Sequence, residues 1–230
     1  MRDRRRMDDV ASLTEHAYQA ISDAIVRLEL KPGEALTQDR LAHWLAISRT
    51  PVREALRRLE QEGIIQMVAG HGLVVTELTL QNVEDMLELL RLLDTHAAHT
   101  AALRRTDEQA ARLLATAQQL LAAAEGHDMA AWSAIDRPYH ETLLEATNNQ
   151  YLRGAILDLR RRLRRVTYNV ALEGGFLLSG THEHLAIAQA IANGNAALAA
   201  QAMQQHLDAV AGKATTLIRT YIIPIRGERF

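Results

Sequence analysis

The sequence predicts a mainly α-helical protein in two parts: a short unit of three helices and a β-hairpin, then an all-α bundle of about six helices. Ala and Leu are abundant and aromatic side chains make up only 4% of the chain, so the core must be aliphatic and helix-favouring. Apolar residues recur at helical spacing over most of the chain. Two short β-branched runs lie close together within residues 64–76, and no later segment resembles a strand.

Composition restricts the class of protein. The chain has 230 residues and no cysteine, which excludes disulfides, thiolate metal sites and cysteine nucleophiles. We find no signal peptide and no apolar run near the ~20 residues of a membrane span, and we expect a cytoplasmic protein with no membrane partner. Residues 1–76 carry eleven basic and eleven acidic side chains, so overall charge gives no support to nucleic-acid binding.

The first part is predicted element by element. We expect a charged, disordered leader over 1–12 and then an amphipathic helix over about 13–28. A second helix follows Thr37, which suits an N-cap. A third helix spans about 49–62, with Ser48 as its expected N-cap.

Two β-rich runs, Ile64–Val68 and Leu73–Thr76, flank a glycine-bearing loop and predict a hairpin. Three helices followed by a hairpin are typical of a winged helix-turn-helix, which we place at 13–76. We place an all-α domain at 79–220 and a C-terminal tail at 221–230. Its helices are expected near 79–104, 106–125, 128–147, 149–172, 179–193 and 195–220.

The third helix carries the features of a DNA-reading helix. Arg49, Arg53 and Arg57 are one turn apart and share a face, while Val52 and Leu56 lie opposite. One face can therefore pack while the other presents guanidinium groups to the major groove. The alternative is a surface helix whose arginines are simply solvated, and the surrounding helices and hairpin favour the DNA-binding interpretation.

Further DNA contacts are expected at the two ends of this unit. The hydroxyl groups of Ser48 and Thr50, with the backbone N–H groups at the helix start, are placed to hold a phosphate. His71 and Gly72, at the tip of the hairpin, could reach the adjacent minor groove or backbone.

Two stretches resemble the signature of the GntR family of bacterial regulators. They are Leu30-Lys-Pro-Gly-Glu-Ala-Leu and Ile47-Ser-Arg-Thr-Pro-Val-Arg-Glu-Ala-Leu-Arg-Arg-Leu-Glu-Gln-Glu-Gly. The resemblance covers residues 13–76 and implies that Arg49, Thr50 and Arg53 contact DNA, with His71 and Gly72 on the wing. The chain departs from the family at Ala46, where glycine is usual in the turn.

The second part contains a candidate metal site. Asp136 and His140 are four residues apart on one helix, and His184 and His206 lie on two later helices. Carboxylate with imidazole suits a divalent transition metal, Zn, Ni, Mn or Fe. Spacing alone does not decide the matter, because histidines on separate helices are usually unrelated.

The motifs around these residues resemble those of the FCD effector domain, found in the FadR branch of the GntR family. The motifs are Asp136-Arg-Pro-Tyr-His140, Glu183-His184 with Ile187 and Ala190-Ile191, and Met203-xx-His206-Leu. The resemblance spans roughly 79–220 and implies that Asp136, His140, His184 and His206 bind the metal. Pro138 and Asn195 depart from the pattern, and Pro138 is expected to kink its helix.

Arginines are candidates to bind an effector. Arg91 matches the position of a family arginine near the effector, and its alternative is an exposed ion pair with Asp94 or Glu88. The arginine run 160–165 is expected to lie on a solvated or interdomain face, unless one member points into the pocket. His182 competes with His184 as a ligand, and the motif favours His184.

These features predict a homodimeric, ligand-responsive regulator of double-stranded operator DNA, a repressor rather than an enzyme. Its effector would be a small carboxylate that completes the metal's coordination shell. One alternative is a regulator for which the metal itself is the signal. Another is a metal-dependent hydrolase, for which Glu183 and Glu141 are the nearest candidate bases.

Overall fold

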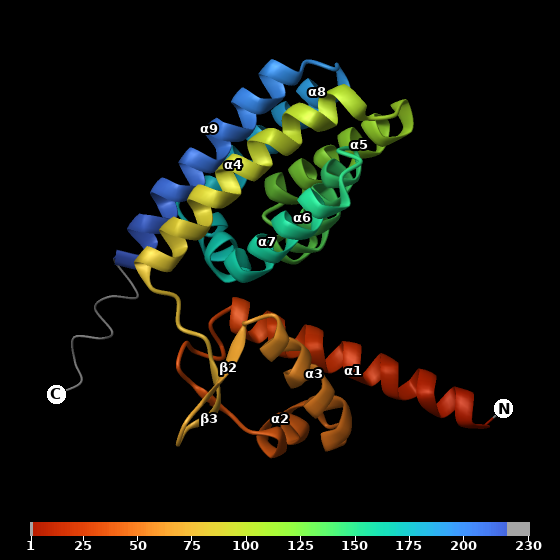
Figure 1. Ribbon diagram of the computed structural model, residues 1–230, viewed down its shortest axis with the longest axis vertical. Helices are drawn as coiled ribbons and strands as arrows, with labels where there is room; N and C mark the ends of the chain where they lie inside the picture. Colours follow the sequence, from red (N-terminus) through yellow and green to blue (C-terminus); the bar gives the residue numbers. More distant parts are fainter. Residues whose placement is uncertain (1, 220–230) are drawn as a thin grey trace. The chain divides into compact units, whose positions relative to one another are not determined.

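The computed structural model describes residues 2–219, with side chains described from Ala11 onward. The chain divides into two compact units between Thr79 and Leu80 (Figure 1). The predicted tail at 221–230 lies outside the described residues. No helix in the described part is long and apolar enough to cross a membrane.

The first unit combines three helices with a small antiparallel sheet within the described residues. Its elements are α1 (Arg2–Val26), β1 (Ala35–Leu36), α2 (Gln38–Leu45), α3 (Arg49–Gln61), β2 (Ile65–Val68) and β3 (Gly72–Val75). The sheet order is β1-β3-β2, and Val74 of the central strand pairs with Ala35 on one side and Gln66 on the other. The helices and the hairpin therefore form a winged helix-turn-helix.

Two features of this unit differ from the sequence prediction. Helix α1 begins at Arg2, so the expected disordered leader is helical, in a segment without glycine or proline. Strand β1 was not predicted, because two residues are too short to show a period. Gly33 takes a left-handed conformation with φ 76°, and its N–H donates to the Val75 carbonyl at 2.8 Å, which brings β1 beside β3.

The core of the first unit joins α1 to α3. Ile21 on α1 and Val52, Leu56 and Leu59 on α3 are buried together. Ile65 at the start of β2 joins the same cluster. Burial of these aliphatic faces fixes α3 by one side and leaves the other at the surface.

Ala46 forms the turn between α2 and α3 in a left-handed conformation, with φ 53° and ψ 37°. Its N–H closes α2 by donating to the Ala42 and His43 carbonyl groups. A Cβ atom in this region costs free energy that glycine does not pay. The turn is therefore formed, at some cost, without the usual glycine.

Replacing this alanine should stabilise the first unit. We expect Ala46→Gly to raise its free energy of unfolding by about 1 kcal/mol, because the Cβ strain is removed. Ala42→Gly, inside α2, should lower it by about 1 kcal/mol. Urea unfolding of both variants measures the difference, and an unstabilised Ala46→Gly protein would contradict the strain argument.

The second unit is helical throughout the described residues. Its elements are α4 (Leu80–Arg104), α5 (Asp107–Glu125), α6 (Met129–Glu145), α7 (Gln150–Ala171), α8 (Phe176–Ala192) and α9 (Ala196–Leu217). Helix α4 packs along α9, and α5 packs against α6 and α8 (Figure 1). The predicted helices agree with these bounds to within about three residues at each end.

The two departures from the family pattern are accommodated locally. Helix α6 continues through Pro138, so Asp136 and His140 stay on one helix. Asn195 is the N-cap of α9, where its side chain accepts the Leu198 N–H at 3.1 Å. Both residues are therefore compatible with the helices that carry the candidate site.

Candidate functional site

Helix α3 has one packed face and one guanidinium-bearing face. Val52 and Leu56 are buried, whereas Arg49, Arg53 and Arg57 are exposed. The folded unit therefore presents the three arginines predicted to meet DNA on a helix fixed from its other side.

Ser48 is the N-cap residue of α3, as predicted. Its hydroxyl makes no capping hydrogen bond within the described residues. Ser48 and Thr50 are both exposed. Their hydroxyl groups thus lie at the surface, at a helix terminus whose dipole favours a phosphate.

The three exposed arginines differ in their partners. Arg49 Nε lies 2.7 Å from Asp39 Oδ1, and Arg53 Nε lies 3.5 Å from Glu54 Oε1. Arg57 has no charged partner among the described residues. The three arginines therefore differ in whether a nearby carboxylate offsets their positive charge before DNA binds.

Arg58, next along α3, belongs to the scaffold. Its Nη1 lies 2.7 Å from Glu15 Oε2 on α1, and its Cζ lies 3.6 Å from the centre of the Tyr18 ring. The Tyr18 hydroxyl donates to Glu62 at 2.7 Å. These contacts connect α1 to the C-terminal end of α3.

The hairpin tip places the two predicted wing residues at the surface. His71 and Gly72 are exposed, and the His71 N–H donates to the Val68 carbonyl at 3.0 Å to close the turn. Gly70 and Gly72 have φ of 78° and 75°, a region that suits glycine. The turn therefore leaves His71 exposed on a short loop, with its Nδ1 3.3 Å from the Ala69 carbonyl oxygen.

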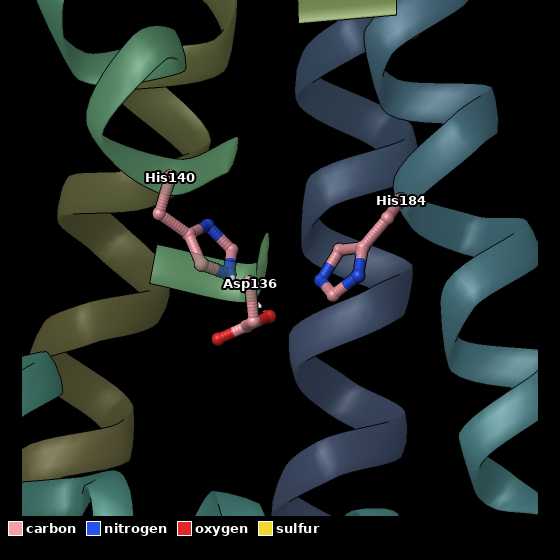
Figure 2. Close-up of side chains that lie close together, drawn as sticks. All are labelled: Asp136, His140 and His184. Atoms are coloured by element: carbon pink, nitrogen blue, oxygen red, sulfur yellow. Dashed lines mark ion pairs between the residues drawn. The ribbon is translucent and has the colours of Figure 1, made fainter. Parts of the chain in front are cut away.

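In the helical unit, three of the four predicted metal ligands converge. Asp136 and His140 come from α6 and His184 from α8, and one ligand atom from each lies within 4.8 Å of the others. The His140 and His184 rings lie edge to face with their centres 5.2 Å apart, and Figure 2 shows the Asp136 carboxylate below them. His140 Nε2 lies 3.5 Å from Asp136 Oδ1.

The fourth predicted ligand, His206 on α9, lies beside this cluster. Its ring centre is 4.5 Å from that of His184, and it is buried. The His206 Nδ1 lies 2.7 Å from Glu183 Oε2, as a ring N–H that donates to a carboxylate. This hydrogen bond leaves Nε2 as the nitrogen with a lone pair, the pattern in which a carboxylate orients a metal-binding histidine.

The protonation of the cluster suits a metal. Burial, together with nearby His206 and His140, holds the pKa of His184 well below its usual value, so its ring is neutral. Burial alone would raise the pKa of Asp136, but His140, His184 and Arg160 outweigh it and hold that pKa below its usual range. A neutral imidazole and an ionised carboxylate are the forms that bind metal.

His184 provides the test of whether the residues fit a metal. Both of its ring nitrogens are buried, and neither has a hydrogen-bond partner in the described structure. A buried polar atom without a partner costs about 1–3 kcal/mol. A cation bound by His184, Asp136 and His140 would satisfy one of these nitrogens, so the donor set fits.

An arginine that the sequence did not single out lies beside the cluster. Arg160 on α7 pairs with the buried Asp94 of α4 at 2.5 Å. Its charge acts on Asp136, His140 and Tyr139, and its Nε has no partner. From the sequence, this residue is anticipated only by the alternative for the 160–165 run, in which one arginine points into the pocket.

Arg91 does not join this group. Its Nε lies 3.0 Å from Asp208 on α9, and both side chains are about half exposed. Arg91 therefore pairs with Asp208 rather than with the cluster, and its role in effector binding stays a prediction. Asp94, one of the partners considered for Arg91, is instead paired with Arg160, because it occupies the buried face of α4.

Two family models match the chain. The FCD domain matches residues 85–209, more than half of the chain, and the model for bacterial regulatory proteins of the gntR family matches residues 13–75. The chain belongs to the gntR family and carries an FCD domain.

Relatives and solved structures agree with this membership. An HTH-type regulator of Agrobacterium vitis, from the TAR-I ttuE-ttuC' intergenic region, is 32% identical over 56% of this chain and 77% of its own length. HTH-type transcriptional regulator LutR of Bacillus subtilis is 28% identical over 78% of this chain and 90% of its own. The structure of E. coli McbR/YncC has the same fold, with a TM-score of 0.74, 20% identity, and coverage of 91% of this chain and 98% of that one.

Family membership decides between the broad classes of function. This gntR-family protein is a DNA-binding transcription regulator and not an enzyme, so the hydrolase alternative is dropped. The winged helix-turn-helix is the part that binds operator DNA. The helical domain remains to be assigned a role from its own residues.

Substitution of two neighbouring arginines on α3 should distinguish a residue that binds DNA from one that stabilises the fold. We expect Arg57→Ala to leave the free energy of unfolding within about 0.5 kcal/mol and to reduce the salt dependence of duplex binding by about one phosphate contact. Arg58→Ala should lower the unfolding free energy by about 1 kcal/mol, because it loses Glu15 and the Tyr18 ring. Urea unfolding and fluorescence anisotropy at several salt concentrations measure both; the reverse assignment would refute this division.

Proposed function

We propose that this regulator is a homodimeric repressor whose DNA binding is controlled by a small carboxylate held at a metal in the helical domain. The observation that carries the proposal is the buried, unpartnered His184 beside Asp136 and His140. A regulator needs no catalytic base, and an anion receptor in a different domain from the DNA-reading helix suits a sensor.

The metal would be held by Asp136, His140 and His184, with His206 as the fourth ligand. Bound there, a divalent transition metal supplies positive charge and open coordination positions that attract a carboxylate. The chain's own contribution is orientation: Glu183 holds Nδ1 of His206, which leaves Nε2 of that ring as the nitrogen that would bind the metal.

Arg160 is the residue best placed to bind the effector carboxylate. Asp94 pairs with one terminal nitrogen of its guanidinium, and its buried Nε has no hydrogen-bond partner. The guanidinium is also close enough to the cluster to lower the pKa of Asp136. Guanidinium and carboxylate pair with matched geometry. We therefore assign effector binding to Arg160, whereas the family resemblance suggests Arg91.

The homodimer would form through α4. Leu89, Leu92 and Leu103 are 47%, 64% and 66% exposed and follow one stripe with His96 and His99, at spacings of three and four residues. This spacing is the seam by which one helix packs on another. Exposed leucines in such a row mark an interaction surface.

Charge favours a second copy of α4 in the antiparallel direction. The N-terminal half of the helix carries Glu84, Asp85 and Glu88, and the C-terminal half carries His96 and His99. An antiparallel copy keeps the acidic cluster of each helix away from that of the other. A parallel copy would place the two acidic clusters side by side.

The same helix offers a route from effector to DNA. Helix α4 begins at Leu80, directly after the winged helix-turn-helix, and bears both Asp94 and the exposed leucines. A carboxylate that binds Arg160 weakens its hold on Asp94, and a buried carboxylate without its partner is costly. Movement of α4 relieves that cost and shifts the population of dimers that fit an operator.

Thermal unfolding tests the metal and the effector together. Saturating Zn, Ni, Mn or Fe should stabilise the wild type, by about 2.7 kcal/mol at a hundred times the Kd. A panel of small carboxylates should stabilise the metal-loaded protein further.

The controls separate the site from its surroundings. His184→Ala should lose both responses, whereas His182→Ala, at an exposed histidine two residues away, should keep them. Operator binding that follows metal alone, with no carboxylate response, would favour the metal as the signal. An unchanged response in His184→Ala would remove the proposed site.

Sedimentation tests the dimer. Leu92→Glu places like charges within the seam and should convert the protein to monomers at concentrations where the wild type is dimeric. Leu198→Glu, at an exposed leucine on α9, should remain dimeric. If Leu92→Glu sediments as the wild type does, the copies meet elsewhere.

A further inference from the structure

The exposed arginines of α3, Arg49, Arg53 and Arg57, are called the recognition arginines here. Arg49 differs from the other two because its acidic partner comes from another helix. Asp39 lies in the first turn of α2 and Arg49 is the first residue of α3, across the turn of the helix-turn-helix motif. Arg49 Nε is 2.7 Å from Asp39 Oδ1, although the two side chains are 72% and 66% exposed. No core packing requires this contact, so it needs another explanation.

The atoms involved suggest one. An arginine has five N–H groups, one on Nε and four on the two terminal nitrogens. The contact with Asp39 is at Nε, whereas the two terminal nitrogens of an arginine form the fork that pairs with the N7 and O6 atoms of guanine. A side chain held in advance also loses less freedom when it binds.

The charge of Asp39 acts in the same direction. A carboxylate beside the guanidinium is repelled by phosphates, so it makes Arg49 a poor contact for the DNA backbone and leaves the base edge as its favourable partner. Arg57 is the opposite case on the same helix face, because it has no charged partner among the described residues. Its full charge suits a phosphate.

We propose that Asp39 is a positioning residue that makes Arg49 the guanine-reading side chain of each half-site, and that Arg57 contacts the backbone. This inference rests on operator binding by the winged helix-turn-helix and adds which arginine reads sequence. It assigns a role in specificity to Asp39, a residue that does not itself touch the bases.

Selection from a duplex pool with a randomised central segment tests the proposal on the full-length protein. The wild type should enrich a two-fold symmetric motif with one guanine in each half-site that Arg49→Ala no longer selects. Asp39→Ala should lower the preference for that guanine over the other bases by roughly tenfold. It should also bind duplex of random sequence more tightly, since one negative charge is removed.

Two further variants keep the result interpretable. Asp39→Asn retains an acceptor oxygen without the charge and should keep part of the preference for guanine. Glu34→Gln removes an equal charge from the same unit, where Glu34 pairs with Arg40 and no recognition arginine, and should select the wild-type motif. Thermal unfolding of each variant shows that the domain is folded during selection.

The outcomes are distinct. Loss of affinity in Asp39→Ala that is equal for every base at every position would overturn the proposal, and so would an unchanged motif. A wild type that enriches no motif would overturn operator recognition itself, and the positioning role with it. A shift of preference confined to the position that Arg49 reads would establish Asp39 as its positioning residue.

Discussion

The helical domain is organised around an imidazole that its own helices do not satisfy. Both nitrogens of His184 are buried without a hydrogen-bond partner, whereas the other three predicted ligands each contact an oppositely polarised group. Asp136 lies beside His140, and His206 is held by Glu183. Folding alone therefore leaves a cost of about 1–3 kcal/mol per unmet group, which a ligand from outside the chain can remove.

Two buried hydrogen bonds hold the helices in the register that this cluster needs. The Tyr139 hydroxyl donates to the His184 carbonyl at 2.8 Å, and Trp132 Nε1 donates to Thr181 Oγ1 at 2.9 Å. Both join α6 to α8, the helices that supply the converging ligands. A slip of either helix would break bonds that cannot be replaced by water, so the cluster is held in place before anything binds.

Sequence reasoning predicted the helices, and the convergence of Asp136, His140 and His184, better than the contacts between helices. Helical periodicity and caps such as Thr37 are local, so they are legible in a single sequence. The contact of Asp94 with Arg160 spans 66 residues, and no spacing rule specifies it. Arg91 and Arg160 look alike in sequence, and only the buried face of α4 decides which has a partner inside the domain.

Residues 1–76 carry no net charge, yet the winged helix-turn-helix can bind DNA because only some of its basic residues are held in ion pairs within the scaffold. Arg40 and Arg58 are paired with acidic residues of the scaffold, which removes them from the field that DNA meets. On the exposed face of α3, Arg49 and Arg53 also lie beside carboxylates, and Arg57 alone of the three has no charged partner among the described residues. Nonspecific attraction, which grows with the number of phosphates neutralised, therefore stays weak at this face. A weakly charged reader gains selectivity through base contacts and through the doubling of half-sites in a dimer, and it can be released from DNA by a modest change in how its two copies are held.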